Sequence, residues 1–290
     1  MFMQNCEKTM IKVAVPNKGV LSEPSLDLLK ACGYKANKAT KSLSSIDNAN
    51  GIEFYFLRPN DIPMYVGRGI IDAGITGIDF CEESDSPAVK VLDLPFGTSK
   101  HCAAVPDKSK WQSLLDLRNL RIATSFPGIV KKYFGASATP ELVVLEGAVE
   151  ISVGLGIADA VVDVVETGTT LSQAGLRILG EPLFRSNAAL FAHPDRQNTP
   201  EVQTLIRRIE GKLMAMAYKM VEYDVPSALL EKACAVTPGF ESPTVAPLQN
   251  KDWYSVKAMV KSEKVNSVMD ELRDLGCKGI LLFTIESARV

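Results

Sequence analysis

Apolar and polar positions follow two different periods along the first two thirds of the chain. In residues 22–33, Leu26 and Leu29 recur at helical spacing, Ser22 can cap the start and Gly33 ends the segment. Helices are also expected at 59–69 and 127–135. The apolar runs typical of strands are 11–15, 52–57, 72–76, 89–96, 102–106, 120–125, 141–147 and 159–165. Strands that alternate with helices predict an α/β fold with mostly parallel strands.

The pattern changes after residues 200–223, the longest segment with helical spacing. Residues 233–248 are rich in proline and threonine and are expected to be extended, and residues 253–261 alternate as a strand. A last strand is expected at 280–290, after a helix at 262–279 whose apolar face carries Val265, Val268, Met269, Leu272 and Leu275. These elements predict a separate small α+β domain of about 75 residues.

Composition and charge narrow the function classes. Apolar residues make up 46% of the 290 residues, and the net charge is −2, so no basic field favours a nucleic acid or a membrane. Six cysteines form no Cys-x-x-Cys pair and there are only two histidines, which argues against zinc or a disulfide framework. No apolar run approaches the roughly 20 residues that span a bilayer. The N-terminus has no apolar core of a secretory signal, so we expect a cytoplasmic protein.

Polar side chains follow the expected strands. In open α/β sheets, ligands bind beyond the carboxyl ends of the strands. The three cations there, in a chain that is net acidic, indicate a local anion site; each could also be an ordinary solvated loop residue. The side chains in these positions are Lys18, Arg58, Asp79, Lys100, Thr124 and Ser125.

The segment VVDVVETGTTL, residues 161–171, leaves a strand and opens a helix. The unpaired amides of a helix N-terminus bind phosphate, and Gly168 allows a positive φ there. Thr167 or Thr169 could instead be a simple helix cap. Asp163 lies within the apolar strand, and a buried carboxylate is costly unless it is paired or faces a cavity. Near the end of its strand it could accept hydrogen bonds from sugar hydroxyls, whereas Asp159 begins the strand and is expected to be structural.

Several segments carry a resemblance to a known family. An apolar strand, an acid and Thr-Gly-x-Thr resemble the ribose-5-phosphate loop of phosphoribosyltransferases. The wider context is VAVPNKGVLSEPSLDLL, FLRPNDIPMYV, DAGITGIDF, RIATSFP, GAVEISVGLGIADAVVDVVETGTTL and TPGFESPTVAPL. In this order the six segments resemble the long form of the ATP phosphoribosyltransferase family, from about residue 11 to the C-terminus.

The resemblance implies a fold and a domain plan. The fold is α/β, with a two-lobed catalytic core resembling the type II periplasmic-binding-protein fold and a small ferredoxin-like α+β domain at the C-terminus. Residues 1–96 and 186–215 would form catalytic lobe I, and residues 97–185 would form lobe II with the phosphoribosyl-binding loop. Residues 216–290 would form a regulatory domain.

The resemblance also implies the reaction, the first step of histidine biosynthesis. N1 of the ATP adenine attacks C1 of phosphoribosyl pyrophosphate, and pyrophosphate leaves with Mg²⁺ bound to it. Such an oxocarbenium-like reaction needs positioning and electrostatics more than a nucleophilic side chain. The sequence agrees, because His101 and Cys102 are neighbours whose side chains would point apart on a strand.

Site residues follow from the matching positions. Asp163 would hold the ribose hydroxyls, and Lys18 and Arg58 would meet substrate phosphates as catalytic groups. Glu146 and Glu150 would approach ribose or metal, or only complement a helix start. Protein ligands of Mg²⁺ are not identified, since pyrophosphate would hold most of it. The substrate-binding candidates are Glu166, Thr167, Gly168, Thr169, Thr170, Lys100, Glu146 and Asp79.

For the C-terminal domain, the resemblance implies feedback inhibition by histidine. An amino acid needs a carboxylate for its ammonium group and donors for its carboxylate. Asp224, Phe240, Ser242 and Thr244 lie in the matching segments and can supply both. Alternatively, the prolines and glycine there only form turns, and the domain makes subunit contacts. The family also implies homodimers that assemble into a homohexamer.

The chain departs from the family pattern at two places. Val20 stands where the family often has an arginine after Lys-Gly, and Gly97-Thr98-Ser99-Lys100 stands where it often has Gly-Arg-Ser-Arg. Contacts to the nucleotide are expected to differ there, although Lys100 keeps one charge. Two α/β lobes with a polar cleft would also suit a non-catalytic solute sensor. That class usually carries an export signal and has no need of a Thr-Gly-Thr-Thr loop beside an acid.

Overall fold

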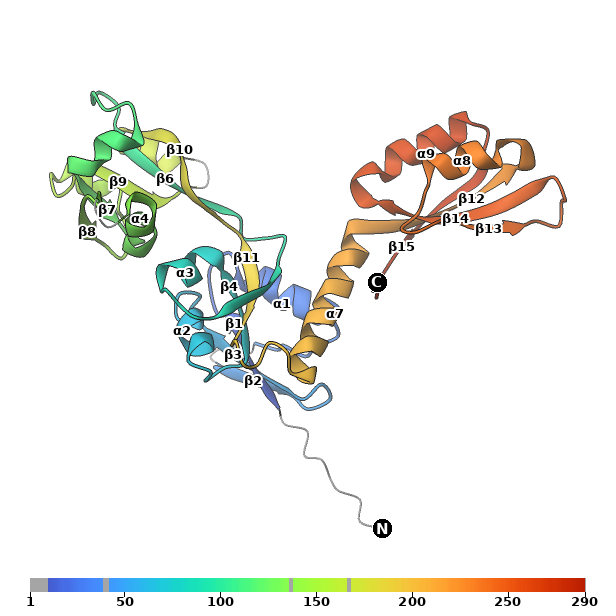
Figure 1. Ribbon diagram of the computed structural model, residues 1–290, viewed down its shortest axis with the longest axis horizontal. Coiled ribbons are helices and arrows are strands. Elements are labelled where there is room, and N and C mark those ends of the chain that lie inside the picture. The colour runs from blue at the N-terminus through green and yellow to red at the C-terminus, as the bar shows by residue number, and fades with distance from the viewer. Residues whose placement is uncertain (1–9, 39–41, 136–137, 166–167, 290) are drawn as a thin grey trace, which may run out of the picture. The chain divides into compact units, whose positions relative to one another are not determined.

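The computed structural model describes residues 10–38, 42–135, 138–165 and 168–289, and the chain divides into two compact units. The first extends to Gln203 and the second begins at Thr204 (Figure 1). The first unit contains two sheets, which we call sheet A and sheet B, and the second unit contains one. No helix within the described part of the chain is long and apolar enough to cross a membrane.

Sheet A contains six strands and is built mainly from the first third of the chain. Its helices are α1 (Ser22–Ala31), α2 (Ile62–Gly67) and α3 (Ile78–Glu83). In spatial order, the strands are β2 (Ser44–Asp47), β3 (Ile52–Leu57), β1 (Ile11–Pro16), β4 (Ala73–Gly77), β11 (Ala188–Ala192) and β5 (Val89–Asp93).

Sheet B contains five strands and belongs to the middle of the chain. Its helical segments are η1 (Leu114–Asn119), α4 (Pro127–Phe134), α5 (Ile151–Gly154) and α6 (Thr169–Gln173). In spatial order, the strands are β10 (Leu176–Ser186), β6 (Ser99–Pro106), β9 (Ala160–Val164), β7 (Arg121–Thr124) and β8 (Glu141–Val144).

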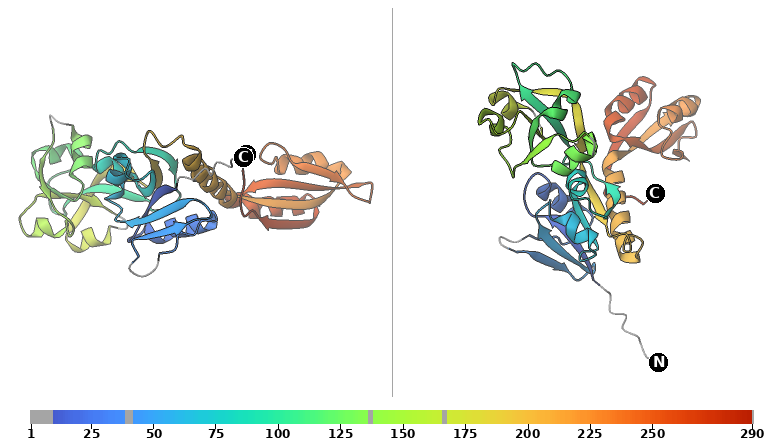
Figure 2. Two further views of the ribbon diagram at one scale, coloured as in Figure 1. Left: turned by 90° about the horizontal axis from the view of Figure 1, so that it is seen from below. Right: turned by 60° about the vertical axis from the view of Figure 1, so that its left-hand side comes forward.

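The two sheets share one strand order. Apart from the edge strand β2 of sheet A, each sheet has four strands in the order second, first, third, fourth, with a strand that arrives from the other sheet between the third and the fourth: β3-β1-β4-β11-β5 in sheet A and β8-β7-β9-β6-β10 in sheet B. The inserted strands β11 and β6 run antiparallel to their neighbours, as does the edge strand β2, so both sheets are mixed. The other strands of each sheet, β1, β3, β4 and β5 in sheet A and β7, β8, β9 and β10 in sheet B, run in one direction, so the expectation of mostly parallel strands is confirmed. The expected two-lobed α/β core of the type II kind is confirmed, and Figure 2 shows its two sheets from two further directions.

The strands of sheet B are continuous apolar runs because both faces of the sheet are buried. Ala103, Val105 and Val162 face one side with Val130 of α4, whereas Ala104 and Val161 face the other side, which α5 and α6 cover. A strand that is buried on both faces has no polar face to alternate. Asp163 therefore stands out, because it interrupts such a strand.

The second unit is a four-stranded antiparallel sheet with two helices. Helix α7 (Pro200–Ala217) leads from the first unit into β12. The elements are β12 (Tyr218–Pro226), α8 (Leu230–Val236), β13 (Thr244–Pro247), β14 (Trp253–Lys261), α9 (Val265–Asp274) and β15 (Lys278–Thr284), with η2 (Ser227–Leu229) and η3 (Ser262–Lys264) as short turns. The sheet order β13-β14-β12-β15 is that of a ferredoxin-like domain, as expected.

Three expected boundaries in this region are wrong. The strand expected at 280–290 begins at Lys278 and already ends at Thr284. The helix expected over 200–223 ends at Ala217, and β12 follows it directly. The reason is a change of period: Val221, Tyr223 and Val225 are each fully buried, with less buried residues between them. Residues 233–248 are not all extended either, because α8 continues to Val236.

Candidate active site

The carboxyl ends of strands from both sheets open onto one cavity of about 610 Å³ within the first unit. Sheet A contributes the residues after β1 and β3 and those of α3, and sheet B contributes the residues after β7 and β8. This is where α/β sheets bind ligands. The lining consists of Lys18, Arg58, Asn60, Phe80, Glu83, Ser84, Ser125, Phe126, Pro127, Val144, Leu145 and Glu146.

Three of the expected site residues line this cavity together. Asn17 donates its backbone N–H to the carbonyl of Leu57 at 2.7 Å, so the chain leaves β1 beside the end of β3. Lys18 and Arg58 follow these two residues and are both exposed at the cavity. Glu146 reaches it from the other sheet, after β8. The cavity therefore combines two cations from sheet A with a carboxylate from sheet B.

The sequence did not identify the aromatic part of this cavity. Phe80 of α3 and Phe126, which precedes α4, lie with ring centroids 5.9 Å apart. Phe80 and Ser84 were missed because α3 was not expected as a helix. A signal existed, since Pro127 stands at the first turn of α4, where proline is common, and so marks the strand-to-helix turn after β7.

Asp163 and Lys100 lie on one face of sheet B and are not among the residues that line the cavity. Cys102 pairs with Asp163 across β6 and β9, and Lys100 lies two residues before Cys102, so Lys100 and Asp163 share a face. Asp163 is half-buried, and its carboxylate accepts a hydrogen bond from the amide of Val164 at 2.8 Å. Burial raises the pKa of Asp163, and the nearby charge of Glu150 also raises it.

The loop after β9 has the backbone conformation that its glycine permits. Gly168 has φ 75° and ψ 2°, in the left-handed region, and it directly precedes α6. Thr169 and Thr170 begin that helix and are exposed. Glu166 and Thr167 lie outside the described residues. Gly168, Thr169 and Thr170 thus form the start of α6, after the carboxyl end of β9, the strand that carries Asp163.

Asp79 is placed differently from the other expected site residues. It is buried, and its carboxylate lies 3.1 Å from Nε2 of His101 and accepts a hydrogen bond from Ser99 at 3.3 Å. Its backbone N–H donates to Oγ of Ser186 at 3.0 Å. Because Ser99 and Ser186 pair across β6 and β10, Asp79 joins α3 to both strands that connect the sheets. Its role as a substrate ligand stays a prediction. Its contacts with Ser99, His101 and Ser186 connect parts of the fold.

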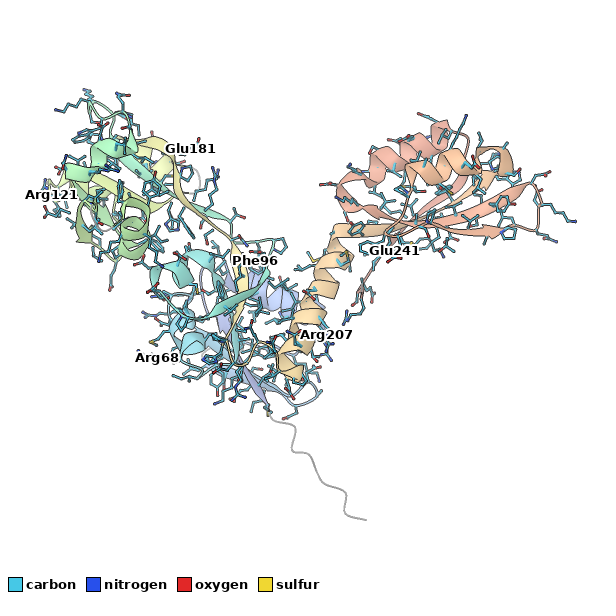
Figure 3. All side chains as sticks on the ribbon, viewed as in Figure 1. Arg68, Phe96, Arg121, Glu181, Arg207 and Glu241 are labelled. Carbon is cyan, nitrogen blue, oxygen red and sulfur yellow. The ribbon has the colours of Figure 1, made fainter. Side chains whose placement is uncertain are left out.

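Asp159, at the other end of β9, has the structural partner that its position suggested. The guanidinium of Arg121 lies 2.9 Å from its carboxylate, which also accepts the backbone N–H of Arg121 at 3.0 Å. Arg121 is labelled in Figure 3. The hydrogen bonds from Arg121 lower the pKa of Asp159.

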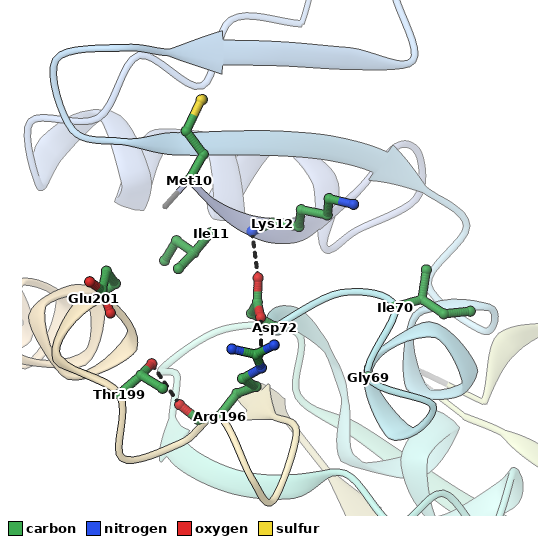
Figure 4. A pocket seen from close by; sticks show the side chains of 9 residues that line it. All are labelled: Met10, Ile11, Lys12, Gly69, Ile70, Asp72, Arg196, Thr199 and Glu201. Carbon is green, nitrogen blue, oxygen red and sulfur yellow. Dashed lines mark hydrogen bonds and ion pairs between the residues drawn. The ribbon is translucent and has the colours of Figure 1, made fainter. Parts of the chain in front are cut away.

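A second cavity, of about 300 Å³, lies at the opposite ends of the sheet A strands (Figure 4). There the carboxylate of Asp72 accepts the backbone N–H of Lys12 at 2.8 Å and lies 3.6 Å from Nε of Arg196. Thr199 and Glu201 line it as well, beside the start of α7. Its charges are mixed, and it contains no residue expected in the site.

The residues expected to bind histidine are in the second unit. Asp224 pairs with Ser255 in β14, and Thr244 pairs with Lys257 two residues further along β14, so Asp224 and Thr244 share the sheet face turned away from α8 and α9. Phe240 is 49% exposed and packs edge-on against Tyr218, with ring centroids 6.1 Å apart. Ser242 is exposed just before β13.

Comparisons with known proteins find relatives along almost the whole chain. The family model described as ATP phosphoribosyltransferase (HisG) matches residues 58–211, and the model described as HisG, C-terminal domain, matches residues 215–287. The ATP phosphoribosyltransferase of Bifidobacterium longum (strain DJO10A) is 44% identical over 285 residues, which cover 97% of this chain and 100% of that protein. The enzyme of Corynebacterium glutamicum (strain R) is 45% identical over 282 residues, with the same two coverages.

A solved structure is similar as well. The ATP phosphoribosyl transferase (HisG:HisZ) complex from Thermotoga maritima has a TM-score of 0.60 and 27% identity, over 69% of this chain and 97% of that chain. Relatives that match along almost the whole chain are named transferases, which leaves the alternative of a non-catalytic sensor without support. The strand order, the cavity at the strand ends and these matches together show that the chain belongs to the ATP phosphoribosyltransferase family of histidine biosynthesis, in the form that carries a C-terminal domain.

Proposed function

We propose that this enzyme transfers the phosphoribosyl group of phosphoribosyl pyrophosphate to N1 of ATP. The products are phosphoribosyl-ATP and pyrophosphate. The observation that carries the proposal is the cavity at the strand ends, where Lys18 and Arg58 from sheet A face a lining that sheet B completes with Glu146. Two substrates with many phosphate groups require cations at such a place.

The reaction suits a site without an activated nucleophilic side chain. The bond from C1 of ribose to the pyrophosphate oxygen breaks, the oxygen keeps the electron pair, and N1 of adenine bonds to C1. The protein has to align the two substrates and stabilise the leaving phosphates. In this proposal, Lys18 and Arg58 stabilise substrate phosphates, and Lys100 does so from the face of sheet B that it shares with Asp163.

Asp163 and the loop after it form the ribose-phosphate part of the proposal. A half-buried carboxylate with a raised pKa is an unfavourable group for the fold alone, and hydrogen bonds from ribose hydroxyls would explain why it is there. The 5′-phosphate would lie against the start of α6, where Gly168 gives the left-handed turn and Thr169 and Thr170 begin the helix. Glu166 and Thr167 would belong to the same loop.

Mg²⁺ fits this proposal as a metal that is bound mainly through substrate. The described residues contain no group of three or more histidine, cysteine or acidic side chains that could hold a metal ion by themselves. Glu146 supplies a carboxylate at the cavity, and Mg²⁺ commonly combines one or two such groups with substrate phosphates. When bound, the ion would neutralise charge on the departing pyrophosphate.

The second unit is proposed to bind histidine as a feedback inhibitor. Asp224 would pair with the ammonium group, while Ser242 and Thr244 would donate to the carboxylate, and Phe240 would pack against the ring. The support is that Asp224 and Thr244 share one sheet face and that Phe240 packs on Tyr218 of β12, the strand that carries Asp224. The homodimer or homohexamer, the cytoplasmic location and the expected domain boundaries are likewise proposals.

The first prediction concerns turnover, measured as pyrophosphate release from ATP, phosphoribosyl pyrophosphate and Mg²⁺. Asp163→Ala is expected to lower kcat/KM by about 100-fold or more, because the ribose hydroxyls lose their acceptor in the transition state. Asp159→Ala is the matched control on the same strand and is expected to stay within about threefold, since Asp159 only pairs with Arg121. Equal activity of Asp163→Ala and wild type would contradict the assignment.

The second prediction concerns the stability cost of the same carboxylate. Because the pKa of Asp163 is raised in the folded state, the unfolded chain releases this proton first, and ionisation weakens the fold as pH rises through the folded pKa. Asp163→Asn should therefore have a higher free energy of unfolding than wild type at pH 7, and this advantage should vanish in acid. Urea unfolding at both pH values checks this, and an Asn variant that is less stable at pH 7 would argue against it.

The third prediction concerns the second unit. Isothermal titration of the intact protein is expected to detect histidine binding, and Asp224→Ala should weaken it about tenfold or more through loss of a charged partner. Asp270→Ala, which removes an exposed acid on α9, should bind like wild type. If wild type binds no histidine, the regulatory role falls, whatever the outcome for turnover.

A further inference from the structure

Helices α3 and α4 meet within the first unit, although α3 accompanies sheet A and α4 accompanies sheet B. Both flank the substrate cavity: α3 through Phe80, Glu83 and the C-cap residue Ser84, and α4 through its first residue, Pro127. The contact between these helices therefore joins the two sides of the proposed active site.

Glu83 makes two polar contacts across this junction. Its two carboxylate oxygens accept the backbone N–H groups of Gly128 and Ile129, at 2.9 and 3.0 Å. These amides are in the first turn of α4, where they have no partner within the helix. Phe126, at the N-cap position, offers no side-chain cap, so the cap comes from a residue on the other helix. A carboxylate at a helix N-terminus is also favoured by the helix dipole.

Gly128 shows how closely the two helices approach. A Cβ at this position would lie 2.6 Å from the backbone oxygen of Glu83 and 2.9 Å from its Oε2. Since the first of these atoms is backbone, the helices would have to separate to admit any larger residue. A second tether, from Lys132 to Glu82 at 2.9 Å and to Asp85 at 3.1 Å, is solvent-exposed and therefore weaker.

The junction determines where the cavity lining lies. Ser125, Phe126 and Pro127 occupy the turn that leads into α4, so the position of α4 fixes theirs. On the other side, Phe80 lies one turn before Glu83 in α3 and packs against Phe126. Without the Glu83 contact, the lining residues before α4 would no longer be held in a fixed position relative to those of α3.

We propose that Glu83 is a positioning residue that assembles the substrate cavity before substrate binds, by holding α4 against α3. This inference rests on the proposed function of the same cavity. If the junction loosens, only a fraction of the free enzyme has the assembled cavity, and each apparent dissociation constant rises by the inverse of that fraction. At saturating substrate, binding shifts all of the enzyme to the state with the assembled cavity, so kcat is retained.

The test compares Glu83→Ala and Glu83→Gln with wild type in the pyrophosphate-release assay. In Glu83→Ala, KM should rise about tenfold for both ATP and phosphoribosyl pyrophosphate, because a lost helix cap typically costs about 1 kcal/mol. The value of kcat should stay within about twofold of wild type. Glu83→Gln should show a smaller rise, because its amide oxygen keeps one acceptor. Glu82→Ala, which weakens only the exposed tether, should stay within about twofold of wild type.

Gly128→Ala approaches the same contact from the other helix. It should raise both KM values while leaving the Glu83 carboxylate in place, and the double variant Glu83→Ala/Gly128→Ala should raise them by less than the product of the single effects. Multiplicative effects would mean that the two residues act separately, which would overturn the proposal. A fall in kcat at unchanged KM, or a change in KM for one substrate only, would overturn it as well.

Titration with ATP separates this inference from the proposed function. The Kd of ATP should also rise about tenfold in Glu83→Ala, a result that needs no turnover. If wild type released no pyrophosphate, the proposed function would fail, and ATP binding by wild type and Glu83→Ala would still decide the role of Glu83. If both proteins bound ATP with equal affinity, and circular dichroism showed that both are folded, the proposed role of Glu83 would be contradicted.

Discussion

The first unit depends on the antiparallel pairing of β6 with β10, the two strands that connect its sheets. Ser99 pairs with Ser186 at the end of this ladder near sheet A, and Asp79 at the start of α3 contacts both of them. His101, which lies in β6 with Ser99, is fully buried, and its imidazole also contacts the carboxylate of Asp79. A carboxylate buried in this way needs its partners, so the crossing strands and α3 are held as one piece. The carboxyl ends of the strands in both sheets can then form one cavity.

The sequence predicted most strands of this unit and their mainly parallel direction, but it missed β2, β10 and β11. Apolar runs such as 11–15 and 52–57 coincide with β1 and β3, because their side chains are buried whichever way the neighbouring strand runs. Parallel or antiparallel pairing depends on where the chain crosses between the sheets, which local periodicity does not encode. The reversed direction of β6 and β11 was therefore not predicted. Strand β10 was missed because its burial is irregular and its register shifts between Leu179 and Phe184, so its apolar residues form no continuous run.

The candidate site was predicted in the same uneven way. Lys18 and Arg58 were identified by their places after strands and Glu146 through the family resemblance, and all three line one cavity. Phe80 and Glu83 were not identified, because they lie in a short helix whose role depends on its contact with α4. Asp79 shows the opposite case: it follows a strand as a site residue would, but its carboxylate is directed to His101. Position along the chain thus indicates the end of the sheet at which a residue lies, whereas packing decides which way its side chain points.

In the proposed enzyme, strand ends from both sheets form one substrate site. Hydrogen–deuterium exchange with and without saturating ATP and phosphoribosyl pyrophosphate tests it most directly. We expect backbone amides in residues 17–20, 58–60, 124–128 and 144–147 to exchange more slowly with substrates bound. Those that line the second cavity, in residues 10–12 and 196–201, should not change. Protection at the second cavity, or on one sheet only, would contradict it.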